Sequence, residues 1–363
     1  MKKALPMILT VLILAGCWDQ ENLGDKRLIN GISFDVSEEN PELIKGGVRA
    51  LDIKSQGGGE IKVNDELLIA KGSTTAELGH NIKHKLPGKL DITKAFLIFI
   101  GDELVKEGLY PLLEIFYRGN LGYLPAKIVI VKGKALDILR IKDNESPIAF
   151  RVLSGIEAAE TNTLIPRGNL FTLWNKMEGD RIDPILPLVT KDKGKSNVTG
   201  VALFNQDKYT GKYLPDEEAT ILLYFMDRKG HTGDVHVPYK ENPKKKFELK
   251  VMKINRNMDV QVSGDNSIIC TLDLELVTEL NADPLSIGNV KKMEKQTSEY
   301  ITKRGGEIME KLQKANSDPL GIGMEVSSKY PELWKQIDWK SEYKNVKIVP
   351  KVSVRIEKTG GLF

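Results

Sequence analysis

The chain has 363 residues, enough for two or three domains and a sizeable hydrophobic core. Apolar residues make up 41% and charged residues 28%, a balance that excludes disorder along the whole chain. The 53 Lys and Arg residues nearly balance the 50 Asp and Glu residues, so the net charge of +3 gives no large electrostatic footprint for nucleic acid. Two cysteines are too few for a disulfide framework.

Residues 1–17 have the composition of a secretion signal. Lys2 and Lys3 form a positive start, and an almost unbroken apolar stretch of about a dozen residues, Ala4–Ala15, follows. This stretch suits a signal peptide and is too short to span a bilayer comfortably. A glycine then precedes Cys17. The order resembles a bacterial lipobox, in which the cysteine thiol receives a diacylglyceryl group before the preceding peptide is removed.

Cys17 is therefore the predicted lipid-attachment site, residues 1–16 the signal peptide and residues 17–27 a tether. The alternative is an ordinary secretory signal or a short anchor that happens to end in cysteine. Two acyl chains make a stable membrane anchor, because each buried methylene contributes about 0.8 kcal/mol. No later stretch approaches 18 apolar residues, so the remainder is expected to be a soluble body outside the cytoplasmic membrane.

The first half of the chain alternates predicted strands and helices. Three consecutive glycines, Gly57–Gly59, indicate a loop and not a phosphate-binding site, because no Lys with Ser or Thr opens a helix after them. The alternation predicts a small mixed α/β unit. The expected strands are Leu28–Val36, Leu43–Ile53, Leu67–Ala70, Ala95–Ile100 and Ala126–Val131. The expected helices are one capped by Ser73 or Thr74 and running to about Leu86, then Asp102–Glu107, Tyr110–Tyr117, Lys134–Ile141, Pro147–Asn162 and Asn169–Glu178.

A polar, glycine-containing stretch, Lys191–Asn197, is the predicted domain boundary. It separates an N-terminal α/β region, residues 28–194, from a C-terminal α+β domain, residues 195–363. In the second region an antiparallel sheet is expected to pack with a long amphipathic helix, which the Gly305-Gly306 pair interrupts by a kink or a close contact. Strands followed by helices predict the α+β class. The expected elements are strands Val198–Phe204, Lys208–Leu214, Phe247–Asn255, Met258–Ser263 and Ile268–Leu280 with a turn at Arg256-Asn257, helices Ile287–Ala315 and Pro331–Gln336, and a final strand Val346–Glu357.

Four histidines are the first candidates for chemistry. His80 and His84 are spaced i, i+4 on a predicted helix, so both rings could face one metal ion. No Glu lies between them in the metalloprotease arrangement and no third ligand is indicated nearby, which favours two solvated imidazoles. His231 and His236 lie near glycines in a loop-like stretch and receive no role.

Carboxylates and the second cysteine give no stronger signal. Asp273 and Glu275 alternate on one predicted strand face, a pattern that a carboxylate pair and a solvated face share. Cys270 lies in an apolar run and indicates a buried structural thiol. Neither a GxSxG nucleophile elbow nor a calcium loop occurs, so the sequence predicts no catalytic residue, cofactor or metal. Turns or helix entries are expected at Asp183-Pro184, Asp283-Pro284 and Asp318-Pro319.

The lipobox is followed at once by Trp18 and Asp19, which gives the opening GCWD. This opening, in a lipoprotein of this length, resembles the Ger(x)C family, the C subunits of bacterial spore germinant receptors. Similar stretches continue along the chain: Thr74–Leu86, Ala95–Leu104 with Glu107-Gly108, Ala126–Leu139, and Thr199–Phe204 with Gly211–Leu214.

The C-terminal part of the resemblance is the most specific. Asp318–Gly323, then Tyr330-Pro331, Trp334 and Trp339, are similar to the family's closing pattern of turn glycines and aromatic residues. We interpret the members of this pattern as framework for turns and core, namely Trp18, Asp318, Gly321, Gly323, Trp334 and Trp339. Departures from the family pattern are Ile322 in place of Phe, Asp91–Thr93 in place of an aromatic-Gly pair, and the Gly305-Gly306 pair.

The resemblance implies a non-enzymatic, lipid-anchored subunit on the outer face of the spore's inner membrane. It implies assembly with two polytopic partners, an A-type subunit and a transporter-like B-type subunit, and participation in the response to nutrient germinants. It leaves open whether this subunit contacts the germinant. The family fold is α+β with three domains, so residues 28–194 are expected to divide into two subdomains.

Two other classes of protein remain as alternatives. A solute-binding lipoprotein of an ABC importer would have the same cellular location and a similar size. It requires two similar strand–helix lobes, however, and only the region before Lys191 alternates strands and helices in that way. A surface hydrolase requires a nucleophile or metal constellation, for which the sequence gives no signal.

Overall fold

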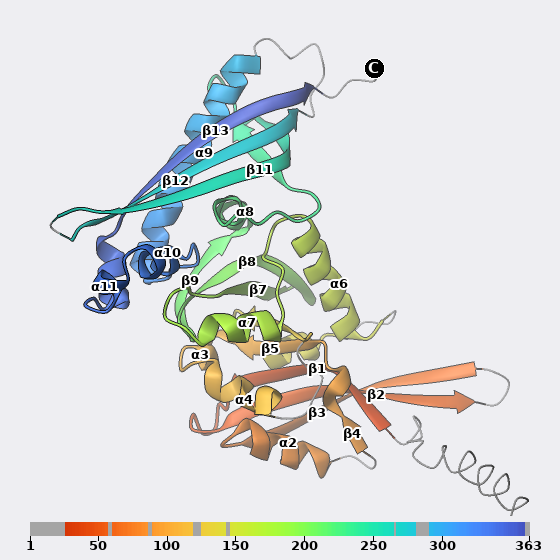
Figure 1. Ribbon diagram of the computed structural model, residues 1–363. Coiled ribbons are helices and arrows are strands. Elements are labelled where there is room, and N and C mark those ends of the chain that lie inside the picture. Colours follow the sequence, from red (N-terminus) through yellow and green to blue (C-terminus); the bar gives the residue numbers. More distant parts are fainter. Residues whose placement is uncertain are drawn as a thin grey trace, which may run out of the picture.

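The structure, a computed structural model, describes residues 26–56, 60–85, 89–118, 125–142, 146–264, 266–280 and 290–359. Within these ranges the chain forms two sheets, one above the other in Figure 1. The first sheet has nine strands in the order β3-β2-β1-β5-β6-β7-β8-β9, with β4 paired to the start of β1, and the second has the order β10-β11-β12-β13.

The strands have the following bounds: β1 Lys26–Val36, β2 Ile44–Gln56, β3 Glu60–Gly72, β4 Lys89–Asp91, β5 Leu97–Gly101, β6 Lys127–Val131, β7 Ile185–Asp192, β8 Lys195–Asn205, β9 Lys208–Pro215, β10 Asp234–Pro238, β11 Lys246–Val262, β12 Ile268–Leu280 and β13 Lys347–Thr359. The helices have these bounds: α2 Thr75–Lys83, α3 Asp102–Val105, α4 Tyr110–Arg118, α5 Ala135–Leu139, α6 Ile148–Thr161, α7 Leu170–Met177, α8 Asp216–Phe225, α9 Val290–Ala315, α10 Ile322–Lys329, α11 Pro331–Trp334 and α12 Trp339–Glu342.

Both faces of the first sheet are covered along its central strands. Strands β1, β5, β6 and β7 pair in parallel, and every residue of β5 is buried. Successive side chains of a strand point to opposite faces, so Leu97 and Phe99 belong to one hydrophobic core and Ile98 and Ile100 to another. The second of these cores also contains residues of α2, α4 and α7. The first contains residues of α5, α6 and α8 and continues into the second sheet.

Helix α8 lies between the two sheets (Figure 1). Its residues from Glu218 to Phe225 are all buried. They share one core with Cys270 and Leu272 on β12 and with Ile301 on α9. The long helix α9 packs against α8 and β13, and an added Cβ at Gly305 would lie 2.7 Å from the Phe225 ring. The two sheets are therefore joined by a continuous apolar core.

The predicted α+β class is confirmed, and one part of that prediction is wrong. The second sheet is not purely antiparallel, because β13 pairs with β12 in parallel along its whole length. Parallel neighbours need a crossover connection, and α9 to α12 supply it here. The turn expected at Arg256-Asn257 is also wrong, since both residues lie inside the 17-residue strand β11. Asn257 is exposed on that strand, where polar residues occur as readily as in turns.

Helix α8 and strand β7 are among the elements that had no counterpart in the sequence prediction. Helix α8 is buried from Glu218 to Phe225, so this part of its sequence lacks the polar stripe that would reveal a helical period. Strand β7 contains Pro187, which pairs with Val201 of β8, and a proline inside an apolar run argued against a strand. Of the kink or close contact expected at the Gly305-Gly306 pair of α9, the structure has a close contact at Gly305. Nothing lies within 4 Å of a Cβ built at Gly306.

The expected domain boundary falls on the turn between β7 and β8. Lys193 and Gly194 form this turn with φ of 46° and 78°, and the flanking strands pair antiparallel. A boundary at this turn would divide the first sheet, and the division into residues 28–194 and 195–363 stays a prediction. No helix in the described part of the chain is both long and apolar enough to cross a lipid bilayer.

Candidate functional site

The predicted lipid-attachment residue Cys17 and the neighbouring Trp18 lie outside the described residues, as does the Gly57–Gly59 loop. Lipid attachment at Cys17 therefore stays a prediction. The structure does describe the other residues interpreted as framework, and these lie in or beside one buried junction: Asp318, Gly321, Gly323, Trp334 and Trp339.

The centre of this junction is the carboxylate of Asp318, of which 1% is exposed. Its Oδ1 accepts hydrogen bonds from the backbone N–H groups of Gly321 at 3.0 Å and Ile322 at 3.1 Å, and its Oδ2 accepts one from Gly323 at 2.8 Å. The loop that begins α10 is thus wrapped around one side chain. Gly321 has a φ of 76°, a left-handed conformation that glycine adopts without strain.

A second buried carboxylate, Asp183, joins this loop to the first sheet. Asp183 lies two residues before β7, and its backbone N–H donates a hydrogen bond to the backbone carbonyl of Asp318 at 2.9 Å. Its Oδ2 accepts from the Asp318 N–H at 2.7 Å, and its Oδ1 accepts from the Gln206 N–H in the β8–β9 turn and from Lys340 Nζ, both at 2.6 Å. The Asp183 side chain therefore connects Asp318, Gln206 and Lys340, which lie far apart in the sequence.

The pKa of Asp318 is raised to about 6, chiefly by burial and also by the neighbouring Asp183 carboxylate. The backbone N–H groups of Gly323 and Ile322 and the charge of Lys340 act against this rise. A raised carboxyl pKa is one mark of general acids. Here, however, both oxygens of Asp318 already accept backbone hydrogen bonds. The arrangement is suited to holding loops together and not to exchanging protons with a substrate.

Aromatic residues close the junction. Trp339 is buried, and an added Cβ at Gly323 would lie 2.5 Å from its Nε1. The Trp334 ring lies 5.6 Å from the Trp339 ring, and the Tyr343 ring lies 5.8 Å from it on centroids. The framework interpretation is confirmed for Gly323 and Trp339, because the missing side chain of one makes room for the indole of the other.

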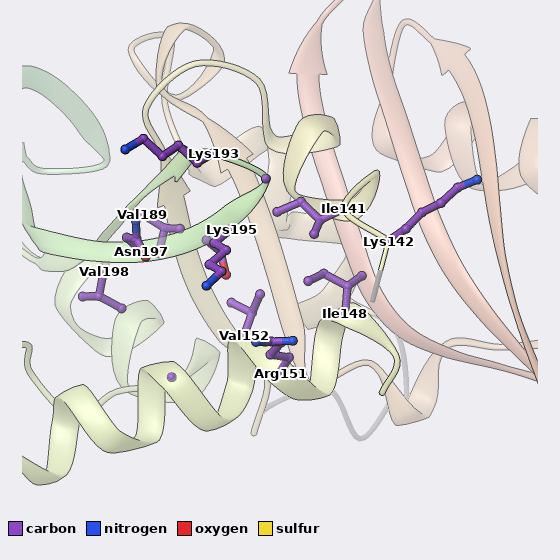
Figure 2. A pocket seen from close by; sticks show the side chains of 13 residues that line it. Ile141, Lys142, Ile148, Arg151, Val152, Val189, Lys193, Lys195, Asn197 and Val198 are labelled. Atoms are coloured by element: carbon purple, nitrogen blue, oxygen red, sulfur yellow. The ribbon is translucent and has the colours of Figure 1, made fainter. Parts of the chain in front are cut away.

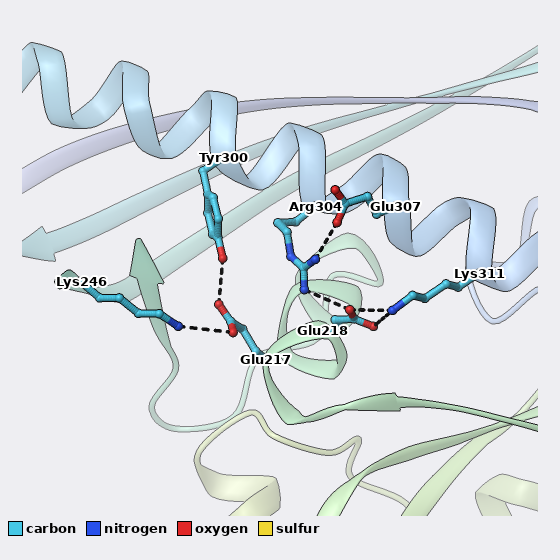
Figure 3. Close-up of polar contacts among 7 residues, drawn as sticks. All are labelled: Glu217, Glu218, Lys246, Tyr300, Arg304, Glu307 and Lys311. Carbon is cyan, nitrogen blue, oxygen red and sulfur yellow. Dashed lines mark hydrogen bonds and ion pairs between the residues drawn. The ribbon is translucent and has the colours of Figure 1, made fainter. Parts of the chain in front are cut away.

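A second polar junction joins α8 to α9 (Figure 3). Glu218, whose side chain is 6% exposed, accepts from Arg304 Nη2 at 3.0 Å and from Lys311 Nζ at 2.7 and 2.6 Å. On the more exposed side, Glu217 accepts from the Tyr300 hydroxyl at 2.9 Å and lies 3.6 Å from Lys246 Nζ. Burial and the hydrogen bond to Glu217 raise the pKa of Tyr300 to about 12.

In the described part of the chain, the predicted candidate histidines have no additional metal-ligating side chains around them. His80 and His84 do come together, with Nε2 atoms 2.9 Å apart, and both are exposed. Among the described residues no group of three His, Cys, Asp or Glu side chains forms around them or elsewhere. His236 lies 3.4 Å from Glu248.

The two strand carboxylates and the cysteine behave as expected from their pattern. Glu275 accepts a hydrogen bond from Asn255 at 2.7 Å, and it lies with Asp273 on the less buried face of β12. Cys270 is fully buried and unpaired, which confirms the predicted structural thiol. Its burial raises the pKa of the thiol to about 12.

A cavity of about 600 Å³ lies between α6, the β7–β8 hairpin and the residues after α5. This volume is in the range of small-molecule pockets. Figure 2 shows Lys195 pointing from β8 toward Arg151 and Val152 on α6, whereas Lys142 and Lys193 point away from the cavity. The charged groups around it therefore do not converge on one point.

Sequence reasoning assigned Asp318 to the framework and missed its partner. Asp183 was predicted only as a turn residue before a proline, and Glu218 and Lys340 were not singled out. The available signal was that Asp183 and Asp318 each precede a proline. Nothing in the spacing of residues 135 positions apart indicates that their side chains meet.

Comparison with known proteins identifies the family. Residues 19–191 match the family model described as spore germination protein N-terminal domain, and residues 199–360 match that of spore germination B3/GerAC like, C-terminal. The chain is 24% identical to spore germination protein GerQC of Bacillus cereus over 99% of both chains. It is 26% identical to spore germination protein A3 of Bacillus subtilis, over 99% of this chain and 98% of the relative.

A solved structure shows the same fold. The crystal structure of the GerBC protein superposes with a TM-score of 0.61 at 13% sequence identity, covering 93% of this chain and 100% of GerBC. The two matched family models follow one another along nearly the whole chain, in the order N-terminal then C-terminal. The chain therefore belongs to the Ger(x)C family of spore germination proteins.

Proposed function

We propose that this protein is the lipid-anchored C subunit of a nutrient germinant receptor, a non-catalytic component needed for the receptor to assemble and respond. The observation that carries this proposal is the succession of the two family models over residues 19–191 and 199–360. The use of both buried carboxylates as backbone acceptors supports a role without catalysis.

The proposed anchor is a diacylglyceryl group on Cys17. Eight residues, 18–25, separate Cys17 from Lys26, where β1 begins, and these nine residue-to-residue steps span at most about 30 Å when fully extended. The end of the first sheet at which β1 and β4 begin would then lie next to the lipid, and the second sheet would lie beyond it. We infer that the protein lies on the outer face of the spore inner membrane, beside A-type and B-type polytopic partners.

Complementation of a deletion strain tests this function. Spores that lack the protein are expected to lose their response to one group of nutrients, and the unaltered gene is expected to restore it. Cys17→Ala is expected to restore little, because the protein is no longer held at the membrane. Cys270→Ser is the matched control: it removes the other cysteine and is expected to retain lipid labelling and germination. Full restoration by Cys17→Ala, with unchanged membrane association, would contradict the anchor.

A further inference from the structure

Two adjoining cavities lie where α6, α7 and Arg228, which follows α8, approach the first sheet. Their volumes are about 100 and 240 Å³. The narrower one is lined by Lys127 on β6 and Lys176 on α7, among others, and the wider one by Lys229. Both are lined by Glu160, Pro166, Arg167 and Arg228, so the two spaces adjoin at these residues.

Positive side chains outnumber negative ones around this space. Five cationic residues line it against two acidic residues, Glu160 and Asp227. Glu160 is already neutralised, since both of its carboxylate oxygens lie 2.8 Å from Lys127 Nζ. In the described part of the chain the side chains of Arg167, Lys176 and Arg228 make neither an ion pair nor a hydrogen bond. These three residues define the cationic cavity.

Lys176 is the most buried of the three, because Arg167 and Arg228 are exposed. Burial, and after it the positive charge of Arg228, lower the pKa of its ammonium group to about 8. Two like charges that face one cavity in a partly desolvated place repel each other. A negative group between them would reduce this repulsion and accept hydrogen bonds from donors for which the described residues supply no acceptor.

We propose that the cationic cavity binds a small oxyanion, the phosphate or carboxylate group of a small molecule. Guanidinium groups match the geometry of both oxyanions with two parallel hydrogen bonds, and a lysine adds a point charge. The narrow cavity is large enough for the anionic group, and the wider one has room for the rest of the ligand. This inference goes beyond the proposed function and does not depend on it.

The titration of Lys176 tests the proposal directly. Lysines of the purified full chain are labelled by reductive ¹³C-methylation and followed by NMR, with Lys176→Gln used to assign the signal. In chloride, Lys176 is expected to titrate near pH 8, well below the exposed lysines. Saturating inorganic phosphate at the same ionic strength is expected to raise its pKa by at least one unit, because a bound anion favours the charged ammonium.

Substitution of the neighbouring arginine gives a second readout. Arg228→Gln is expected to weaken phosphate binding at least tenfold and, without phosphate, to raise the pKa of Lys176, since it removes a repulsive charge. Arg140→Gln is the matched control, because Arg140 is exposed, pairs with Asp137 on α5, and does not line the cavity. It is expected to change neither quantity.

Malonate in place of phosphate distinguishes the two sources of the oxyanion. A stronger effect of malonate would indicate a carboxylate ligand, and a stronger effect of phosphate a phosphate ester. A Lys176 titration that neither anion shifts would overturn the proposal. So would equal weakening by Arg140→Gln and Arg228→Gln, or a response to an acidic peptide alone, which would make the cavity a protein-docking site.

Discussion

Two polar junctions fasten the C-terminal helices of this protein to the rest of the fold, and they use opposite chemistry. At the first, Asp183 and Asp318 are both 1% exposed, and their carboxylate oxygens accept hydrogen bonds mainly from backbone N–H groups. At the second, Glu217 and Glu218 on α8 face charged or hydroxyl-bearing side chains of α9 and β11 (Figure 3).

The difference shows that access of water decides how much the loss of a polar contact destabilises the fold. Water can replace a lost partner at the α8–α9 junction, because Arg304 and Lys311 have side chains that are 26% and 46% exposed. Water is excluded from the carboxylates of the Asp183–Asp318 junction, so a deleted acceptor leaves buried donors unsatisfied. We therefore expect large and salt-insensitive effects at the first junction and small or salt-dependent effects at the second.

The largest effect is expected for Asp183→Ala. It removes the acceptor of two backbone N–H groups and leaves the Lys340 ammonium without its counter-charge, 18% exposed. Breaking a buried pair in this way typically costs about 3–5 kcal/mol. Urea unfolding should show this loss, whereas the exposed neighbour Asp180, changed to Ala, should leave the midpoint nearly unchanged. Equal midpoints for the two variants would contradict the importance of this junction.

The pH dependence of stability is the next test. The pKa of Asp318 is about 6 in the folded chain, compared with 3.8 for an unperturbed aspartate. Between these values the folded state binds the proton more strongly than the unfolded chain, so stability rises as the pH falls from 6 to 4. Wild type should gain up to about 3 kcal/mol relative to Asp318→Asn between pH 7 and pH 4. A relative loss over this range would show that folding lowers the pKa.

Paired glycine substitutions probe the apolar contact beside the second junction. Gly305→Ala would place its Cβ 2.7 Å from the Phe225 ring, and such overpacking costs about 1–3 kcal/mol. Gly306→Ala meets nothing within 4 Å, and replacing a helical glycine with alanine should stabilise by about 1 kcal/mol. Thermal melts should therefore move in opposite directions, and a common shift for both variants would refute the close packing of α8 on α9.

The smallest effects are expected at the two glutamates of α8. Glu218→Gln should destabilise by about 1–2 kcal/mol, because it weakens two charged contacts of a buried side chain. Glu217→Gln should cost less than about 1 kcal/mol, as exposed pairs usually do. Added salt should reduce the loss from Glu218→Gln and leave the loss from Asp183→Ala unchanged. An equal response to salt would remove the distinction between the junctions.

The sequence predicted local structure better than it predicted meetings between distant residues. Helices α6 and α7 begin after Pro147 and Asn169, the residues at which the expected helices start, and Asn169 forms a capping box with Thr172. The turn glycines and Trp339 were assigned correctly to the framework. Such features depend on nearest neighbours or on a short motif, both of which a single sequence contains.

Three features depended on contacts that no local pattern carries. Helix α8 is buried by the second sheet and α9, which erases its amphipathic period. The parallel pairing of β13 depends on the path taken by α9 to α12. The cationic cavity combines α7 with Arg228, about 50 residues further along the chain, and near-neutral overall charge hides such a local excess.

The central claim is that this protein is a receptor subunit, and a cross-linked pull-down of the tagged protein from spore membranes tests it most directly. Mass spectrometry should recover two polytopic germination proteins, one of them transporter-like, in amounts comparable to the bait. Recovery of an importer permease with its ATPase, and of neither polytopic germination protein, would contradict the claim.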